Sequence, residues 1–215
     1  MNHLKDLVVD PNNPRSLSAR SRRGRWNKFL EEFGDISKMR IIDLGGTPDF
    51  WRNVEEKPAH VTVVNLRDAE SSTRIRAVKG DACNPPPDLL GENFDLAISN
   101  SLLEHVGGHA QRARLADVIH QCASRHWVQT PYRYFPIEPH WMAPGFQFLP
   151  FEARVRLSQR WKIGHIRTQD RKTAIERVNE IELIGISQMT DYFPNSEIWR
   201  EKSLSLTKSI VAIQR

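Results

Sequence analysis

A short apolar run that ends in two glycines constrains this chain more than any other feature. Residues 39–48 read MRIIDLGGTP, and the apolar residues around Asp43 are typical of a buried β-strand. Gly45 and Gly46 stop the strand and allow a tight turn that a ligand can approach closely. Asp43 falls at the carboxyl end of the strand, where open α/β sheets bind ligands. The pattern therefore predicts a parallel α/β sheet with a ligand site at this turn.

Three more apolar runs follow, rich in β-branched residues and typical of further strands. They occupy residues 60–66, 75–79 and 94–100. The second run ends near Asn65, about 20 residues after Asp43, where a dinucleotide-binding unit places a ribose-binding acid. The order of these runs supports a nucleotide-type site.

The four segments together resemble a known family. In order they read IIDLGG, VVNL, GDA and FDLAISNSLLEHV. These segments resemble the motifs of class I S-adenosylmethionine-dependent methyltransferases of the small type 11 kind, from about Arg40 to the C-terminus. The resemblance implies an α/β fold with a Rossmann-like, seven-stranded, mostly parallel sheet, helices on both faces and an antiparallel last strand. It implies one domain over residues 1–215, made of an N-terminal helical lid (1–38), a cofactor-binding core (39–131), an acceptor-side loop and helical insertion (132–178), and a C-terminal helix and strand pair (179–215).

The resemblance also implies S-adenosyl-L-methionine as the cofactor and indicates which residues bind it. These are Asp43, Gly45, Gly46, Thr47, Asn65, Leu66, Asp81, Ala82, Asn100 and Ser101. Thr47 stands where the family usually has glycine, and Asn65 stands where it usually has an acid. An Asn amide can accept one ribose hydrogen bond and donate another, so we expect a weaker contact there. Asp81 either reaches the adenine amino group, the role we favour, or only caps a turn.

The N-terminal region predicts a helix that begins at Ser16 or Ser18 and ends at about Phe33, after an extended leader over residues 1–14. Apolar residues spaced three and four apart form one face of this helix: Trp26, Phe29, Leu30 and Phe33. The same helix carries several basic residues: Arg15, Arg20, Arg22, Arg23, Arg25 and Lys28. They form either a solvated basic face or part of a lid with one arginine near the methionine carboxylate of the cofactor.

Residues 132–150 follow a predicted fifth strand at 125–131 and are rich in proline and aromatic residues. Similar segments occur in some type 11 relatives. A loop at this edge of the sheet is where an acceptor would bind, although a structural aromatic plug is a near-equal alternative. We expect His140 to be the general base, with His105 second and Glu138 assisting. In an extended segment Glu138 would face away from His140.

The remaining segments predict further elements. Residues 151–175 read as a basic helix, 179–190 as the last helix, and 197–204 and 209–213 as the last two strands. The three prolines at 85–87 are expected to exclude regular structure.

The composition limits the class of protein. The chain has 215 residues, 39% of them hydrophobic, which suits one domain with a full core. The spacing of Cys83 and Cys122 indicates neither a disulfide scaffold nor a metal site, and it fits a reducing cytoplasm. No apolar run approaches the roughly 18 residues of a membrane span.

The implied activity is methyl transfer, and we expect a small molecule or a glycan or lipid precursor to be methylated on oxygen. The net charge of +5 and the arginines within 154–171 make RNA the second choice of acceptor, although no separate RNA-binding module is visible. Thr47 and Asn65 leave a non-catalytic cofactor-binding protein open. A nicotinamide-dependent oxidoreductase also fits the first turn, but Thr47 and Pro48 interrupt its Gly-x-Gly-x-x-Gly pattern. The sequence does not indicate an oligomeric state.

Overall fold

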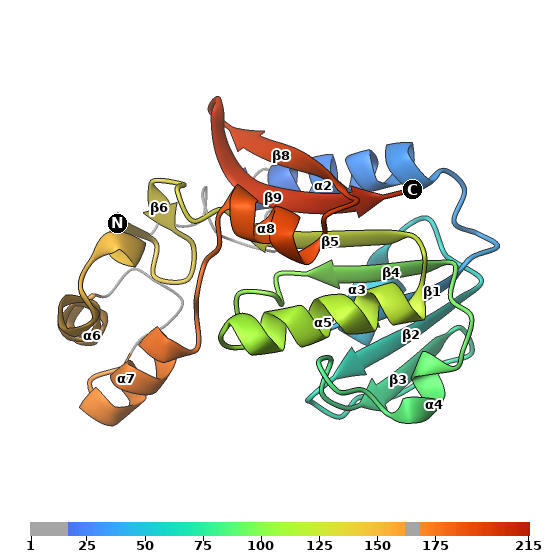
Figure 1. Cartoon of the computed structure of the whole chain (residues 1–215), viewed down its shortest axis with the longest axis horizontal. Helices are drawn as coiled ribbons and strands as arrows, with labels where there is room; N and C mark the ends of the chain where they lie inside the picture. The colour runs from blue at the N-terminus through green and yellow to red at the C-terminus, as the bar shows by residue number, and fades with distance from the viewer. Residues whose placement is uncertain (1–16, 162–167) are drawn as a thin grey trace.

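The computed structural model describes residues 17–161 and 168–215 and is built around a seven-stranded sheet (Figure 1). The strand order is β3-β2-β1-β4-β5-β9-β8. The first five strands pair in parallel, and β9 runs antiparallel to both of its neighbours. The strands are β1 (Arg40–Leu44), β2 (His60–Asn65), β3 (Ile75–Lys79), β4 (Leu96–Asn100), β5 (His126–Pro131), β8 (Glu197–Ser203) and β9 (Leu206–Gln214). The predicted fold class is confirmed.

The strand order reverses beside β1, which lies between β2 and β4. In open α/β sheets such a reversal opens a crevice outside the carboxyl ends of the two strands, and ligands bind there. The turn at Gly45 and the segment after Asn100 leave the sheet at this point. The topology therefore supports the predicted position of the ligand site.

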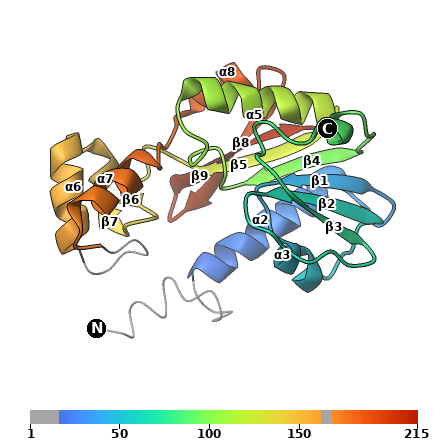
Figure 2. The same cartoon turned by 90° about the horizontal axis from the view of Figure 1, so that it is seen from below.

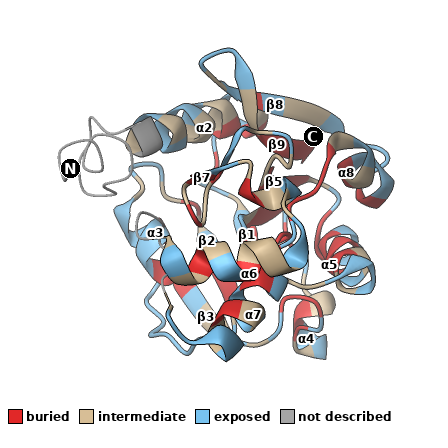
Figure 3. Ribbon diagram, turned by 90° about the vertical axis from the view of Figure 1, so that its left-hand side faces the viewer, coloured by how far each residue is buried: buried red, intermediate tan, exposed pale blue. Residues whose placement is uncertain are grey.

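Helices cover both faces of the sheet, as Figure 2 shows. One face carries α5 (His109–Cys122) and α8 (Ile186–Tyr192), and the other carries α2 (Leu17–Phe33) and α3 (Pro48–Asn53). Because side chains alternate along a strand, β1 contributes to both cores. Ile42 and Leu44 pack beneath α5, and Ile41 packs beneath α2. The buried residues of α5 lie on the side that faces the sheet (Figure 3).

Helix α2 agrees with its sequence pattern. Phe29 and Phe33 are buried, and Trp26 and Leu30 pack against the same core. The helix ends at Gly34, whose φ of 69° closes its last turn with a hydrogen bond to Leu30. The predicted leader, Arg15 and the alternative cap Ser16 lie outside the described residues.

The predicted helices of the C-terminal half need correction. The stretch at 151–175 is not one helix, because the chain forms α6 (Phe151–Arg160) and a separate α7 (Arg171–Asn179). Arg167 lies outside the described residues. The helix predicted at 179–190 is α8 alone, because Ile184 forms a parallel bridge with Tyr132 and Gly185 caps the helix. The stretch before α8 is therefore held extended against the segment that follows β5.

Helices α6 and α7 lie to one side of the sheet beside a small hairpin (Figures 1 and 2). The hairpin pairs β6 (Ile137–Glu138) with β7 (Ala143–Pro144) and is followed by a 3₁₀ turn (Phe146–Phe148). This part has its own core: Trp141, Ala143, Phe146, Val155, Ala174, Val178, Ile181 and Leu183. The segment after β5 is therefore a packed unit beside the sheet.

A smaller expectation was also wrong. The three prolines do not exclude regular structure, because Pro87 is the first residue of α4 (Pro87–Leu90), where its missing N–H costs nothing. Within the described ranges, no helix has the length and apolar character needed to cross a membrane.

Candidate active site

The turn after β1 requires glycine at two consecutive positions. Gly45 has a φ of 87°, donates its N–H to the carbonyl of Val64, and leaves no room for a Cβ, which would lie 2.8 Å from the Leu102 side chain. A Cβ on Gly46 would lie 1.8 Å from Oδ2 of Asp43. The two glycines therefore bring the backbone close to Asp43 and keep the surface open.

Thr47 shows why the third glycine of the family pattern is dispensable here. Its φ of −130° is an extended conformation that any residue adopts, and it stands at the N-cap position of α3. Its side chain makes no capping hydrogen bond. The threonine therefore causes no backbone strain in the turn.

Asp43 is a buried acid with one unused oxygen. It is 3% exposed, and its Oδ2 accepts a hydrogen bond of 2.7 Å from Trp51 Nε1. Its Oδ1 is buried without a partner among the described residues. Burial raises the pKa of Asp43 to about 7, against the opposing effect of the Trp51 hydrogen bond. A buried unpaired acceptor is costly, so the site favours a ligand that brings a cationic donor.

A cavity of about 330 Å³, here called the α2 cavity, opens beside Asp43. It is lined by Arg22, Arg25, Trp26, Phe29, Asp43, Gly45, Gly46, Thr47, Phe50, Ile98, Asn100, Ser101 and Trp127. Arg25 is held at its wall by Glu201 at 3.0 Å and by Oε1 of Gln129 at 2.8 Å. Because Arg22 and Arg25 face the same cavity as Asp43, the site presents both signs of charge to a ligand.

A second cavity of about 330 Å³, the β2–β3 cavity, shares Gly45 with the first. It is lined by Gly45, Val64, Asn65, Leu66, Arg67, Gly80, Asp81, Ala82, Leu102, His105 and Val106. The two cavities together contain every residue that the sequence assigned to the cofactor. The structure therefore brings those ten residues to one edge of the sheet, on both sides of the glycine turn.

Asn65 has a role that the sequence did not reveal. Its amide nitrogen donates to the carbonyls of Gly45 at 3.2 Å and Gly46 at 2.8 Å. Its oxygen accepts from the N–H of Arg67 at 2.9 Å. A carboxylate could not donate these hydrogen bonds, which explains the departure from the family's acid. Its oxygen keeps one lone pair for a ligand hydroxyl.

Asp81 has one of the two roles that the sequence left open. Its Oδ1 accepts from the N–H of Cys83 at 2.9 Å, which stabilises the turn after β3. The same residue lines the β2–β3 cavity beside Ala82 and the exposed Leu66. The capping role is thus observed, and the contact with an adenine stays a prediction.

The carboxyl end of β4 is held in an uncommon conformation. Ser101 has a φ of 51°, a left-handed conformation that costs about 1–2 kcal/mol for a residue with a side chain. Its N–H and hydroxyl both bond to Gln129, at 2.9 Å and 3.1 Å. Asn100 accepts from Trp127 Nε1 at 3.2 Å. These bonds from β5 hold the floor of the α2 cavity in place.

Glu138, His140 and His105 form a chain of hydrogen bonds above this edge of the sheet. Oε1 of Glu138 accepts from Nδ1 of His140 at 2.7 Å, and Oε2 accepts the backbone N–H groups of His140 and Trp141 at 2.8 Å each. The expectation that Glu138 faces away from His140 was wrong, because the chain turns at Pro139 instead of staying extended. Glu138 is 1% exposed and therefore fixes the His140 ring.

His140 in turn faces His105. Their Nε2 atoms lie 3.2 Å apart, and Nε2 of His105 lies 4.0 Å from Oε1 of Glu104. Glu104 is buried, with Oε2 bonded to Thr130 at 2.9 Å and Oε1 unpartnered. One possible ligand atom from each of Glu104, His105 and His140 lies within 4.8 Å of the others, so the three could hold a metal ion. The spacing of 35 residues between the two histidines gave no sign of this in the sequence.

The two histidines differ in proton affinity. Burial, together with the charge of His140, lowers the pKa of His105 to about 4. Burial also lowers the pKa of His140, but its hydrogen bond to Glu138 and the charges of Glu138 and Glu104 outweigh this and raise it above 6.5. His105 is therefore neutral near pH 7.

The fold is that of class I S-adenosylmethionine-dependent methyltransferases, as solved structures show. The N-methyltransferase NodS from Bradyrhizobium japonicum WM9 matches with a TM-score of 0.54 at 12% identity, over 95% of this chain and 97% of that one. A Burkholderia thailandensis 1,6-didemethyltoxoflavin-N1-methyltransferase, solved with S-adenosylhomocysteine, matches with a TM-score of 0.55 at 12% identity, over 90% and 76%. A Rhodobacter sphaeroides protein described as a Zn-dependent alcohol dehydrogenase matches with a TM-score of 0.57 at 14% identity, over 87% and 86%.

At identities of 12–14%, these structures show the fold alone. The reaction has to be inferred from the residues of the site. Neither a family model nor a curated protein matches the sequence.

Proposed function

We propose that this protein is an S-adenosylmethionine-dependent methyltransferase that acts on an oxygen of a small molecule or of a glycan or lipid precursor. The observation that carries the proposal is the pair of cavities on either side of Gly45, with the unpaired Oδ1 of Asp43 at the wall of one of them. The fold supports the proposal, since the neighbouring structures include methyltransferases solved with this cofactor or its product.

The charged groups of the α2 cavity fit the amino-acid end of the cofactor. Asp43 offers a buried acceptor to the ammonium group, and Arg22 and Arg25 offer positive charge to the carboxylate. Because α2 supplies both arginines, we infer that this helix forms the lid of the site.

The β2–β3 cavity fits the adenosine end. The free lone pair of Asn65 would accept a ribose hydroxyl, Asp81 would accept the adenine amino group, and Leu66 would cover the base. A cavity on each side of one turn suits an elongated ligand with its charged end separated from its base.

Bound S-adenosylmethionine supplies a methyl group on a positively charged sulfur. The protein then has to place the acceptor oxygen in line with it and to remove the acceptor's proton. Glu138 orients His140 by accepting its Nδ1 proton, which leaves Nε2 to exchange a proton. We infer that Nε2 of His140, in its neutral form, takes up the acceptor proton and that Glu138 stabilises the resulting imidazolium.

The experiment that tests this proposal is transfer of a labelled methyl group to the components of a cell extract. His140→Ala should lower transfer by about 10²–10⁴-fold, the usual contribution of a general base, and should change S-adenosylhomocysteine affinity by less than about threefold. His60→Ala is the control, because His60 is exposed at the opposite end of the sheet. Near-normal transfer by His140→Ala would place the base elsewhere, and sequence-selective labelling of RNA would overturn the choice of acceptor.

A further inference from the structure

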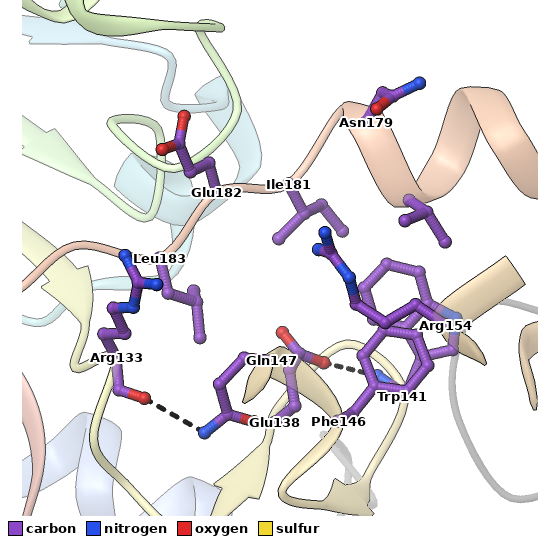
Figure 4. A pocket seen from close by; sticks show the side chains of 11 residues that line it. Arg133, Glu138, Trp141, Phe146, Gln147, Arg154, Asn179, Ile181, Glu182 and Leu183 are labelled. Atoms are coloured by element: carbon purple, nitrogen blue, oxygen red, sulfur yellow. Dashed lines mark hydrogen bonds between the residues drawn. The ribbon is translucent and has the colours of Figure 1, made fainter. Parts of the chain in front are cut away.

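A third pocket lies in the small helical unit, among the segment after β5, α6 and residues 178–183, and Glu138 is part of its lining (Figure 4). It encloses about 240 Å³. It is lined by Arg133, Glu138, Trp141, Phe146, Gln147, Arg154, Val178, Asn179, Ile181, Glu182 and Leu183. The residues come from the segment after β5, from α6 and from the end of α7 onward, so the pocket exists only because these separate stretches pack together.

Two residues that line this pocket carry buried hydrogen-bond donors with no acceptor among the described residues. Trp141 is 2% exposed, and its Nε1 is buried without a partner among the described residues. Nε of Arg154 is likewise buried and unpartnered. Burial and the charge of Arg133 lower the pKa of Arg154, and the charge of Glu182 opposes them. Buried donors of this kind are costly unless a ligand supplies the acceptors.

Among the described residues, the acids of the pocket form their close contacts with groups other than these arginines. The carboxylate of Glu138 already accepts three N–H groups, from Nδ1 and the backbone of His140 and from the backbone of Trp141. The carboxylate of Glu182 forms its salt bridge with Arg112 on α5. Within the described ranges, neither Arg133 nor Arg154 forms a salt bridge. The pocket therefore has an excess of positive charge and of donors.

One acceptor in the pocket is also unused. The amide nitrogen of Gln147 donates to the carbonyls of Arg133 at 3.0 Å and Phe135 at 2.7 Å, which fixes the direction of the side chain. Its Oε1 is left buried without a partner among the described residues. A ligand with an anionic group could accept hydrogen bonds from the donors of the pocket. A hydroxyl close to that group could donate to Oε1 of Gln147.

We propose that this pocket binds the anionic group of the methyl acceptor, a carboxylate or a phosphate, between Arg133 and Arg154. The inference rests on the proposed function, since it assigns the charge of the acceptor. Glu138 connects the two sites, because it lines the pocket and also orients His140. An acceptor held by its anionic end would thus present a neighbouring hydroxyl to the histidine pair.

Calorimetric titration with inorganic phosphate tests the pocket without knowledge of the acceptor. The wild-type protein should bind phosphate, and Arg154→Gln and Arg133→Gln should each weaken binding by about tenfold or more, because each removes a charge-assisted hydrogen bond. Arg156→Gln is the matched control, since Arg156 lies on the same helix with a side chain 70% exposed and should leave binding unchanged. Absence of phosphate binding, or equal binding by all variants, would overturn the proposal.

The labelled product of the methyl-transfer assay tests the role of the pocket. The product should be retained on an anion-exchange resin, and Arg154→Gln should lower its formation by about tenfold or more while S-adenosylhomocysteine affinity stays unchanged. A neutral product would overturn the assignment. If the protein binds phosphate but not S-adenosylhomocysteine, the proposed function and the acceptor role of the pocket are both contradicted. If it binds S-adenosylhomocysteine but not phosphate, only the proposed anion site is contradicted.

Discussion

Asn65 occupies a known position of the motif but makes different hydrogen bonds from the acid expected there. The resemblance expects an acid that binds a ribose, whereas the amide of Asn65 donates to the carbonyls of Gly45 and Gly46. The sequence could predict that the position faces the ligand site but not that its donors hold the turn, because this depends on the distance between two loops. The same limit applied to Glu138, whose contact with His140 depends on a turn at Pro139.

Asn65→Asp should therefore destabilise the protein, although it restores the residue type of the family. The carboxylate loses two hydrogen bonds and faces two carbonyl oxygens, at a cost of about 1–3 kcal/mol in the free energy of unfolding. Urea unfolding at pH 7 measures the change. Asn53→Asp is a control, because Asn53 donates one exposed hydrogen bond to the carbonyl of Asp49, and its loss should be smaller. A more stable Asn65→Asp variant would contradict the role of the turn contact.

Asp43 predicts a dependence of stability on pH. Burial raises its pKa to about 7 from an ordinary value of 3.8. Between these two values the unfolded chain has released a proton that the folded protein still holds, so the free energy of unfolding falls as pH rises from about 4 to about 7. Asp43→Asn removes this titration and should lose less stability between pH 5 and pH 8 in urea unfolding. An equal loss in both proteins would show that Asp43 ionises freely when folded.

At the scale of elements, strands were easier to predict than helices. The five parallel strands contain apolar or β-branched runs that end at polar residues, glycine or proline, so the sequence pattern located them. Strand β8 is mostly polar, and β9 begins at Leu206, before the predicted start at residue 209. The helices after β5 depend on the small core around Trp141 and Val155, which joins segments far apart in the sequence. A periodic pattern over 151–175 could not show that the chain breaks between two helices.

Two glycines, one inside helix α2 and one at its end, should respond in opposite ways to replacement by alanine. Gly24 lies exposed in its interior, and a Cβ there would meet nothing within 4 Å. Gly24→Ala should raise the free energy of unfolding by about 0.5–1 kcal/mol. Gly34→Ala also finds open space but at a φ of 69°, so it should lower the stability. Thermal unfolding of both variants checks this, and a shift in the same direction for both would contradict the described end of the helix.

At the scale of the whole molecule, three spaces matter for the proposed function: the two cavities that share Gly45 and the pocket lined by Arg133 and Arg154. The cavities beside Gly45 lie over the point where the strand order reverses, and the arginine-lined pocket lies beyond the histidine pair. The sequence could predict the first part, because the fold determines which strand ends are adjacent. The sequence did not indicate the pocket, because its lining comes from three separate stretches of the chain.

The most direct test of the central claim is calorimetric titration of the protein with S-adenosylhomocysteine and, separately, with NAD. We predict that the wild-type protein binds S-adenosylhomocysteine and that Gly46→Ala abolishes the binding, because its Cβ would lie 1.8 Å from Asp43. Gly108→Ala should bind like the wild type, since its Cβ meets nothing within 4 Å. Tight binding of NAD with no binding of S-adenosylhomocysteine would contradict the account.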